Sequence, residues 1–259
     1  MYAGDIVLFY KATRMEAKAI NECLDMYCKW SGQCINRSKS STYFSNHTLR
    51  QTTRGIKQIF HMKGLKDSIY LRAPMFLSKS PSKDFSYLQN KLEARLSGWR
   101  SRTLSWVDRS TLILSVAQNL PNYTMSSIKV PSSICDKLNV LTRHFWWKPI
   151  NQDGKFLALK SWDKLCYSKV KGGLGFKKVV VFNNAFLAKL ARMIASKRDS
   201  LCMSLLRAKY KVRQGLLYAN GLKIYSQIWK AIKDTKSIIL KGACYQLGDG
   251  SSINVWNDL

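Results

Sequence analysis

Residues 85–99 read FSYLQNKLEARLSGW, a pattern typical of an amphipathic helix. Large apolar side chains recur at intervals of three and four residues, and they are Phe85, Leu88, Leu92, Leu96 and Trp99. This spacing places them on one face of a helix. A helix of this kind must bury its apolar face against another element. The stretch therefore predicts helices packed on one another.

Similar patterns follow along the rest of the chain. The sequence predicts further helices at 112–120, 131–148, 183–196, 200–212 and 226–240. Pro131 suits a first helical position, and Pro149 closes the helix that it begins. A polar segment at 78–83 contains Pro81 and is interpreted as a hinge. From this hinge onward the chain is expected to be mainly α.

The segment before the hinge mixes strand and helix signals. The apolar run at 6–9 has the length of a strand. Thr13 and Glu16 have the spacing of a capping box, and Gly32 suits the left-handed position after a helix. The predicted fold class is therefore mainly α with a small α+β N-terminal part.

The charge of the chain points to a polyanionic partner. Lys plus Arg is 43 and Asp plus Glu is 15, which gives a net charge of +28, while 46% of the residues are hydrophobic. So much apolar content argues against a disordered tail. We expect nucleic acid ahead of an anionic membrane surface as the partner.

Two segments concentrate this charge. Residues 26–66 contain no acid, which favours a phosphate-facing surface over a merely solvated one. Residues 169–213 carry twelve basic residues against Asp199 alone, and phosphate contact and simple solvation are equally good explanations there.

Several classes of protein are disfavoured. No apolar run reaches the 18 or so residues of a membrane span. The seven Cys are scattered, which suits free buried thiols in a reducing, intracellular compartment. Cys23, Cys28 and Cys34 are interpreted as the buried side of a helix and its exit. Acids among the first 25 residues are atypical of a transit peptide, so nucleus or cytoplasm is preferred over an organelle.

Residues 1–9, MYAGDIVLF, resemble the active-site hairpin of reverse transcriptases, in particular the plant LINE-type (non-LTR retrotransposon) enzymes. Further segments resemble later blocks of that family in the family's order. They are 31–36 with Lys39 and Ser40, 70–74, 96–113, 121–126, 145–147, Trp162, 172–175 with Asn184 and Ala185, 226–229, and 248–258.

The resemblance implies a domain order. It implies a partial reverse-transcriptase palm remnant over 1–77, a thumb-like helical domain over 83–167, a downstream helical region over 168–243, and a hairpin beginning a truncated Cys/His segment over 244–259. The fingers and the first catalytic carboxylate would then precede Met1.

The resemblance also implies the loss of the family's chemistry. The family adds nucleotides with two Mg²⁺ ions held by carboxylates, two of them from an Asp-Asp pair in the hairpin. Gly4 replaces the first Asp of that pair, and Asp5 matches the second. Asp5 would be a weak Mg²⁺ ligand at best, so we expect no polymerase activity and no bound cofactor.

The resemblance still implies binding of nucleic acid. The residues that would contact RNA or DNA, independently of sequence, are Lys39, Tyr70, Trp99, Arg100, Arg102 and Arg109. Trp99 could equally end the apolar stripe as a core residue. The Gly-rich segment 171–175 lacks the ending of a phosphate loop and is interpreted as a turn.

Two alternatives remain open at the level of sequence. The chain could be an active reverse transcriptase, or one completed by a palm from another polypeptide. It could also be a pseudogene product without function. Oligomeric state is not predicted.

Overall fold

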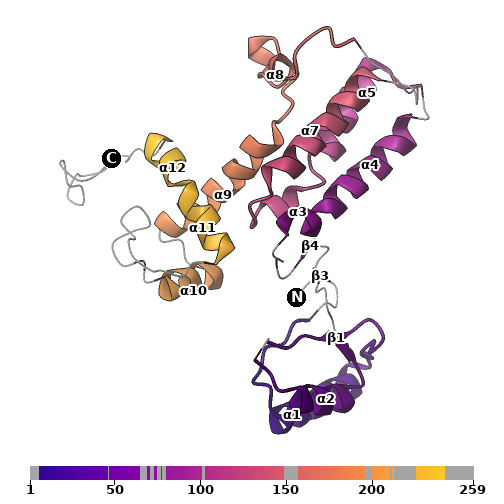
Figure 1. Ribbon diagram of the computed structural model, residues 1–259, viewed down its shortest axis with the longest axis vertical. Helices are drawn as coiled ribbons and strands as arrows, with labels where there is room; N and C mark the ends of the chain where they lie inside the picture. Colours follow the sequence, from indigo (N-terminus) through magenta and orange to yellow (C-terminus); the bar gives the residue numbers. More distant parts are fainter. Residues whose placement is uncertain are drawn as a thin grey trace, which may run out of the picture. The chain divides into compact units, whose positions relative to one another are not determined.

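The computed structural model describes residues 6–45, 47–64, 69–70, 73–74, 77, 80–100, 103–148, 157–196, 200–210, 212 and 226–242 (Figure 1). The chain divides into two compact units, residues 1–76 and 77–259. Each unit has its own buried core and is described by itself.

Unit 1 is built on two helices, α1 (Arg14–Ser31) and α2 (Arg50–Phe60), which pack around Ala17, Ile56 and Phe60. Thr13 Oγ1 accepts a hydrogen bond from the Glu16 backbone N–H at 3.3 Å, which is one half of the predicted capping box. The other half does not form, because the Glu16 carboxylate accepts from the Lys11 N–H instead. Gly32 ends the helix with a φ of 67°, a left-handed conformation that costs glycine little. Both predicted ends of α1 are confirmed.

The strands of unit 1 are short. Parallel strands β1 (Ser41–Thr42) and β2 (Lys63–Gly64) form one pair, and antiparallel β3 (Ile69–Tyr70) and β4 (Ala73–Pro74) form another. The strand predicted at 6–9 does not form, and that prediction is wrong. Residues 6–9 have no strand partner among the described residues, and a strand exists only when it is paired.

The thiol predictions need correction. Six cysteines lie in the described part of the chain and all are free, but only Cys135 among them is buried. Cys23 and Cys34 are exposed, and Cys28 is half-buried. The face of α1 that packs on α2 carries Ala17, Ile20 and Leu24 instead, so the cysteines flank the contact rather than fill it.

Unit 2 is a set of helices (Figure 1). Its first half contains α3 (Pro81–Asp84), α4 (Ser86–Arg100), α5 (Trp106–Leu112), the π-helical turn η1 (Ile113–Ala117), α6 (Asn122–Met125) and α7 (Ser132–Trp147). Its second half contains α8 (Trp162–Leu165), the 3₁₀ turn η2 (Lys169–Lys171), α9 (Val179–Ala195), α10 (Leu201–Lys209), α11 (Gln227–Asp234) and α12 (Lys236–Gly242). The predicted predominance of helix is confirmed.

The larger core of unit 2 lies where α4 packs on α7 (Figure 1). Phe85, Leu88, Leu92 and Leu96 are all buried there, so the stripe in 85–99 does what its spacing predicts. The C-terminal half of α9 helps form a smaller core, in which the ring of Tyr210 stacks on Trp229 with centroids 4.1 Å apart. Helix α9 thereby links the two cores.

Three local predictions are changed by the structure. The segment interpreted as a hinge contains α3, because Pro81 is well placed at a helix N-terminus. Pro131 is the N-cap of α7 rather than its first helical residue. The π-helical turn shifts which residues face inward in the helix predicted at 112–120, so that Ala117 is buried while Val116 is exposed. The hairpin predicted at 244–259 and the closing role of Pro149 lie outside the described residues.

Candidate nucleic-acid interface

The loop before β1 holds Lys39 at the surface of unit 1. The side-chain oxygen of Asn36 accepts hydrogen bonds from the Lys39 backbone N–H (3.1 Å) and from Ser38 Oγ (2.6 Å). The main-chain carbonyl of Asn36 accepts from the Ser40 backbone N–H at 3.0 Å. Asn favours such turns because its side chain imitates a backbone turn. Lys39 is therefore exposed on an ordered loop.

Arg37 fastens this loop to both helices of unit 1. Its guanidinium donates to the main-chain carbonyl of Phe60 at the end of α2 (2.6 Å) and lies 3.3 Å from a carboxylate oxygen of Asp25 on α1. The charge of Asp25 is thus matched by Arg37 and not by Lys39.

Two further lysines lie beside the same loop. Lys63 in β2 pairs with Ser41 in β1, and Ser41 lies two residues after Lys39 along the chain. The ammonium group of Lys57 lies against Gly64 and 6.0 Å from the centre of the Phe44 ring. We call Lys39, Lys57 and Lys63 the lysine cluster. Among the described residues, none of the three forms an ion pair.

Trp99 lies at the end of the stripe on α4. Its side chain is half-buried against the larger core, and its ring centroid is 5.8 Å from that of Phe145. This packing favours the core interpretation of Trp99 over a stacking role.

Arg109 lies inside unit 2, with only 6% of its surface exposed. Its guanidinium donates to the main-chain carbonyls of Trp146 (3.0 Å) and Leu104 (2.9 Å) and lies 4.7 Å from the centre of the Trp106 ring. Burial lowers the pKa of Arg109 from its ordinary value. Through these contacts Arg109 joins helices of unit 2, so it is not part of the proposed nucleic-acid interface.

The other residues predicted to bind are only partly placed. Tyr70 lies in β3 and Arg100 is the last residue of α4, while Arg102, Gly4 and Asp5 lie outside the described residues. The roles predicted for Asp5, Tyr70, Arg100 and Arg102 remain predictions.

Two carboxylates in the described part of unit 1 are engaged within the unit itself. Glu16 accepts a hydrogen bond from the Lys11 backbone N–H at 2.8 Å, and Asp25 faces Arg37. Across the described part of the chain, no three His, Cys, Asp or Glu side chains come together to hold a metal ion.

Sequence reasoning missed a tryptophan cluster in unit 2. The ring of Trp106 lies 4.9 Å from Trp146 and 5.9 Å from Trp147, centre to centre, and Trp146 lies 5.3 Å from Phe176. The adjacent pair at 146–147, at the end of a predicted helix, was the available signal. Trp106 remains half-exposed beside this rigid support.

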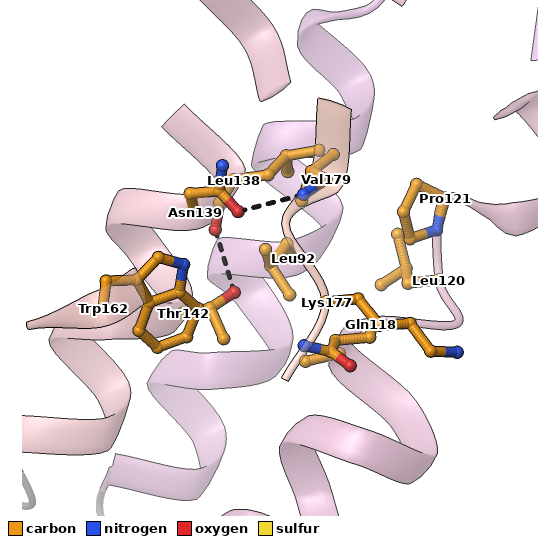
Figure 2. Close-up of a pocket in the computed structure, with 11 residues that line it drawn as sticks. Leu92, Gln118, Leu120, Pro121, Leu138, Asn139, Thr142, Trp162, Lys177 and Val179 are labelled. Carbon is orange, nitrogen blue, oxygen red and sulfur yellow. Dashed lines mark hydrogen bonds between the residues drawn. The ribbon is translucent and has the colours of Figure 1, made fainter. Parts of the chain in front are cut away.

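A small pocket lies between α4, α7 and the start of α9 (Figure 2). It is lined in part by Gln118, Thr142 and Trp162, and both amide atoms of Gln118 are buried without a hydrogen-bond partner. The space has room for about one water molecule. It suits a bridging water and is too small for a nucleotide.

A second basic surface follows the tryptophan cluster. Lys160, Lys164, Lys169, Lys171 and Lys177 are all exposed. Asp163 is the one acid in 157–178, and its carboxylate lies 2.8 Å from the ammonium group of Lys178. This pairing raises the pKa of Lys178. The ammonium group of Lys177 lies 4.1 Å from the centre of the Phe182 ring. Lys160, Lys164, Lys169 and Lys171 form no ion pair among the described residues and are available to an outside anion.

None of the helices in the described part of the chain has the length and apolar character needed to cross a membrane.

Comparison with known proteins places the chain among plant sequences. No family model matches it. It is 32% identical over 188 residues to the Arabidopsis thaliana protein named "Putative ribonuclease H protein At1g65750", a match that covers 70% of this chain but 30% of that protein. It is also 32% identical over 140 residues to the Arabidopsis thaliana protein named "Uncharacterized mitochondrial protein AtMg00310". That match covers 54% of this chain and 90% of the relative. The chain therefore belongs to the family of the uncharacterized mitochondrial protein AtMg00310.

Proposed function

We propose that this chain is a retrotransposon-derived protein that binds RNA or DNA through phosphate contacts, without reading base sequence, and adds no nucleotides. The observation that carries the proposal is the lysine cluster, three lysines on neighbouring segments of unit 1 that form no ion pair among the described residues. The second basic surface, at 160–177, extends the same property to unit 2.

The lysine cluster concentrates positive charge that no described carboxylate compensates. Lysines that repel one another cost free energy when they are held together, and a bound polyanion removes that cost while it releases its own counterions. Phosphate contacts of this kind carry no sequence information. The proposed binding is therefore indifferent to base sequence.

The origin of the chain is supported by two similarities of its sequence. The segments quoted above resemble the plant LINE-type reverse transcriptases in order along the chain. One relative bears the name of a ribonuclease H protein, an activity that acts on nucleic acid. We propose that unit 1 derives from a polymerase palm and that the first helices of unit 2 derive from its thumb.

The absence of nucleotide addition follows from the hairpin sequence. Gly4 cannot coordinate a metal ion where the family has an Asp. Loss of a single electrostatic stabiliser in an active site typically costs about 100- to 1,000-fold in rate, and here a metal ligand itself is replaced. Primer extension on an RNA template with Mg²⁺ or Mn²⁺ should give no product above background. Template-dependent product would show that the chain is an enzyme.

Equilibrium binding tests the central part of the proposal. The full chain should bind 30-nucleotide RNA and DNA strands of unrelated sequence with affinities within about threefold of one another. The variant Lys39→Gln/Lys57→Gln/Lys63→Gln should weaken binding to every strand by a similar factor.

A matched control separates the cluster from net charge. Lys11, Lys18 and Lys29 are exposed in unit 1, with Lys11 just before α1, Lys18 within it and Lys29 in its last turn. Changing these three to Gln removes the same charge and should have a much smaller effect. Equal losses from both triple variants would mean that only total charge matters and that the lysine cluster is not a site.

A further inference from the structure

The segment 165–175, here called the Val170 loop, is held by its own main-chain hydrogen bonds. The Leu174 N–H donates to the Leu165 carbonyl (2.9 Å), and the Gly175 N–H donates to the Tyr167 carbonyl (2.8 Å). Nearer the tip, the Ser168 carbonyl accepts from the N–H groups of Lys171 (2.9 Å) and Gly173 (3.1 Å). The loop is thus a closed, ordered turn.

Glycines make this turn possible. Gly172 and Gly175 have φ values of 77° and 74°, which side chains other than glycine rarely adopt. A Cβ atom at Gly173 would lie only 2.1 Å from the Tyr167 carbonyl oxygen. Each of these three glycines therefore fits one backbone conformation of the loop. A loop that already holds this conformation loses little conformational entropy when it binds a partner.

The base of the loop is anchored in the larger core of unit 2. Leu165 and Phe176 are buried, and the ring of Trp162 stacks on Phe176 with centroids 5.4 Å apart. The tip is the opposite. Val170 is 98% exposed, and it stands between two exposed lysines, Lys169 and Lys171. A rigid loop thus presents one aliphatic side chain between two cations.

This combination identifies the chemistry of a partner. Burial of a fully exposed valine on binding is favourable, and the flanking ammonium groups attract anions on both sides of it. Unstacked bases flanked by phosphates supply both, and apolar side chains are known to enter base steps as wedges. Tyr167, which is half-exposed at the start of the turn, adds an aromatic face on which a base can stack.

We propose that the Val170 loop is a wedge for single-stranded nucleic acid. Val170 inserts beside an unstacked base while Lys169 and Lys171 contact the neighbouring phosphates. The proposal rests on the proposed function and deepens it, because it assigns unit 2 a preference for single strands over duplex. In a duplex the bases are stacked and paired, so insertion of Val170 carries an additional cost.

An anionic lipid surface is the competing partner. Leu157 and Leu159 are also exposed, and the same lysines would attract acidic headgroups. Insertion of one valine and its neighbours buries little apolar area, and even a single myristoyl chain gives only marginal membrane binding. Nucleic acid is therefore the better match, and vesicles serve as a separate arm of the test.

The experiment compares Val170→Ser with Val181→Ser in the full chain. Val181 is also exposed but lies on α9, so it controls for loss of a surface valine. The probes are a 30-nucleotide single strand of mixed sequence, its 30-base-pair duplex, and phosphatidylserine–phosphatidylcholine vesicles. Val170→Ser should weaken binding to the single strand about fivefold to tenfold and to the duplex less than about twofold. Val181→Ser should change neither.

Each other outcome has a defined meaning. If wild type binds the single strand and Val170→Ser binds it equally well, the wedge is overturned while the proposed function stands. If Val170→Ser loses binding to vesicles alone, the loop is a lipid contact and the wedge is again overturned. If wild type binds neither nucleic acid, the proposed function itself fails. Far-UV circular dichroism of both variants shows that the fold is kept, as expected for exposed positions.

Discussion

Arg109 Nη1 donates a hydrogen bond to the main-chain carbonyl of Trp146 at 3.0 Å, which joins α5 to the last turn of α7. The contact spans 37 residues of sequence, and Trp106 closes over the guanidinium as a cation–π partner. A residue that the sequence suggests for nucleic acid is thereby used to hold unit 2 together.

Replacement of Arg109 by Ala should therefore destabilise unit 2. Two main-chain carbonyls lose their donor, and a buried polar group without a partner costs about 1–3 kcal/mol. We expect the free energy of unfolding to fall by about 2–4 kcal/mol, measured by urea denaturation followed by circular dichroism. Arg95→Ala, at an exposed position of α4, is the control and should change stability little. If Arg109→Ala instead folded normally and bound nucleic acid with a smaller salt dependence, Arg109 would be a phosphate contact after all.

Asn183 should be the second critical polar residue of unit 2. It is buried on α9, where its side-chain oxygen accepts from the Val130 N–H (2.9 Å) and its amide nitrogen donates to the carbonyls of Met125 and Ile128 (2.9 Å each). Asn183→Ala should lower the free energy of unfolding by about 2–4 kcal/mol. Asn139→Ala removes only one such bond, to the Val179 N–H, and should cost clearly less. Equal losses of stability in the two variants would contradict the inference that Asn183 stabilises unit 2 through three hydrogen bonds.

Two glycines of unit 2, Gly173 and Gly98, should change the free energy of unfolding in opposite directions when each is replaced by Ala. Gly173→Ala places a methyl group against the Tyr167 carbonyl and should disrupt the Val170 loop, lowering stability and single-strand affinity together. Gly98→Ala lies within helix α4 with open space around the added methyl group. It should raise the free energy of unfolding by about 0.5–1 kcal/mol, because Ala favours the helix. A tolerated Gly173→Ala would show that the loop is looser than its hydrogen bonds indicate.

Burial of Cys135 should make stability depend on pH above neutrality. Burial, together with the nearby charge of Asp136, raises the pKa of the Cys135 thiol from 9.0 to about 11. Between pH 9 and 11 the Cys135 thiol keeps its proton in the folded chain but loses it in the unfolded chain. The contribution of the buried thiol to the free energy of unfolding is therefore full below pH 9 and is lost as the pH rises towards 11. Unfolding of wild type and Cys135→Ala at pH 8, 9, 10 and 11 isolates the effect. The stability difference between them should shrink with rising pH, and a constant difference would rule out the thiol as its source.

The sequence predicts the fold best where its pattern is local. The stripe at 85–99 specifies its own helix and its own buried face, and Thr13 and Gly32 mark the ends of α1 by side-chain and backbone chemistry within a few residues. The strand predicted at 6–9 fails because strand formation depends on a partner, which lies elsewhere in the chain or outside it. A local sequence pattern does not indicate whether such a partner is present.

The candidate site is predicted less well for the same reason. The basic character of residues 26–66 is visible in the sequence, but the arrangement of Lys39, Lys57 and Lys63 on neighbouring segments results from the β1–β2 pairing and the packing of α2. The burial of Arg109 depends on Trp106 and Trp146, from different helices. The exposure of Val170 follows from glycine geometry that a turn prediction does not resolve. Tertiary contacts decide which basic residues face outward.

The most direct test of the central claim is the salt dependence of binding by the full chain. Affinity for a 30-nucleotide single strand, measured by fluorescence anisotropy between about 50 and 300 mM KCl, gives the slope of log K against log salt, which is near −0.7 for each phosphate contacted. With the lysine cluster and the exposed lysines of 160–171 engaged, we predict a slope of about −3 or steeper. Changing the lysine cluster to Gln should reduce its magnitude by about 2. A wild-type slope near zero would mean that the positive charge does not meet phosphates, and the account would be wrong.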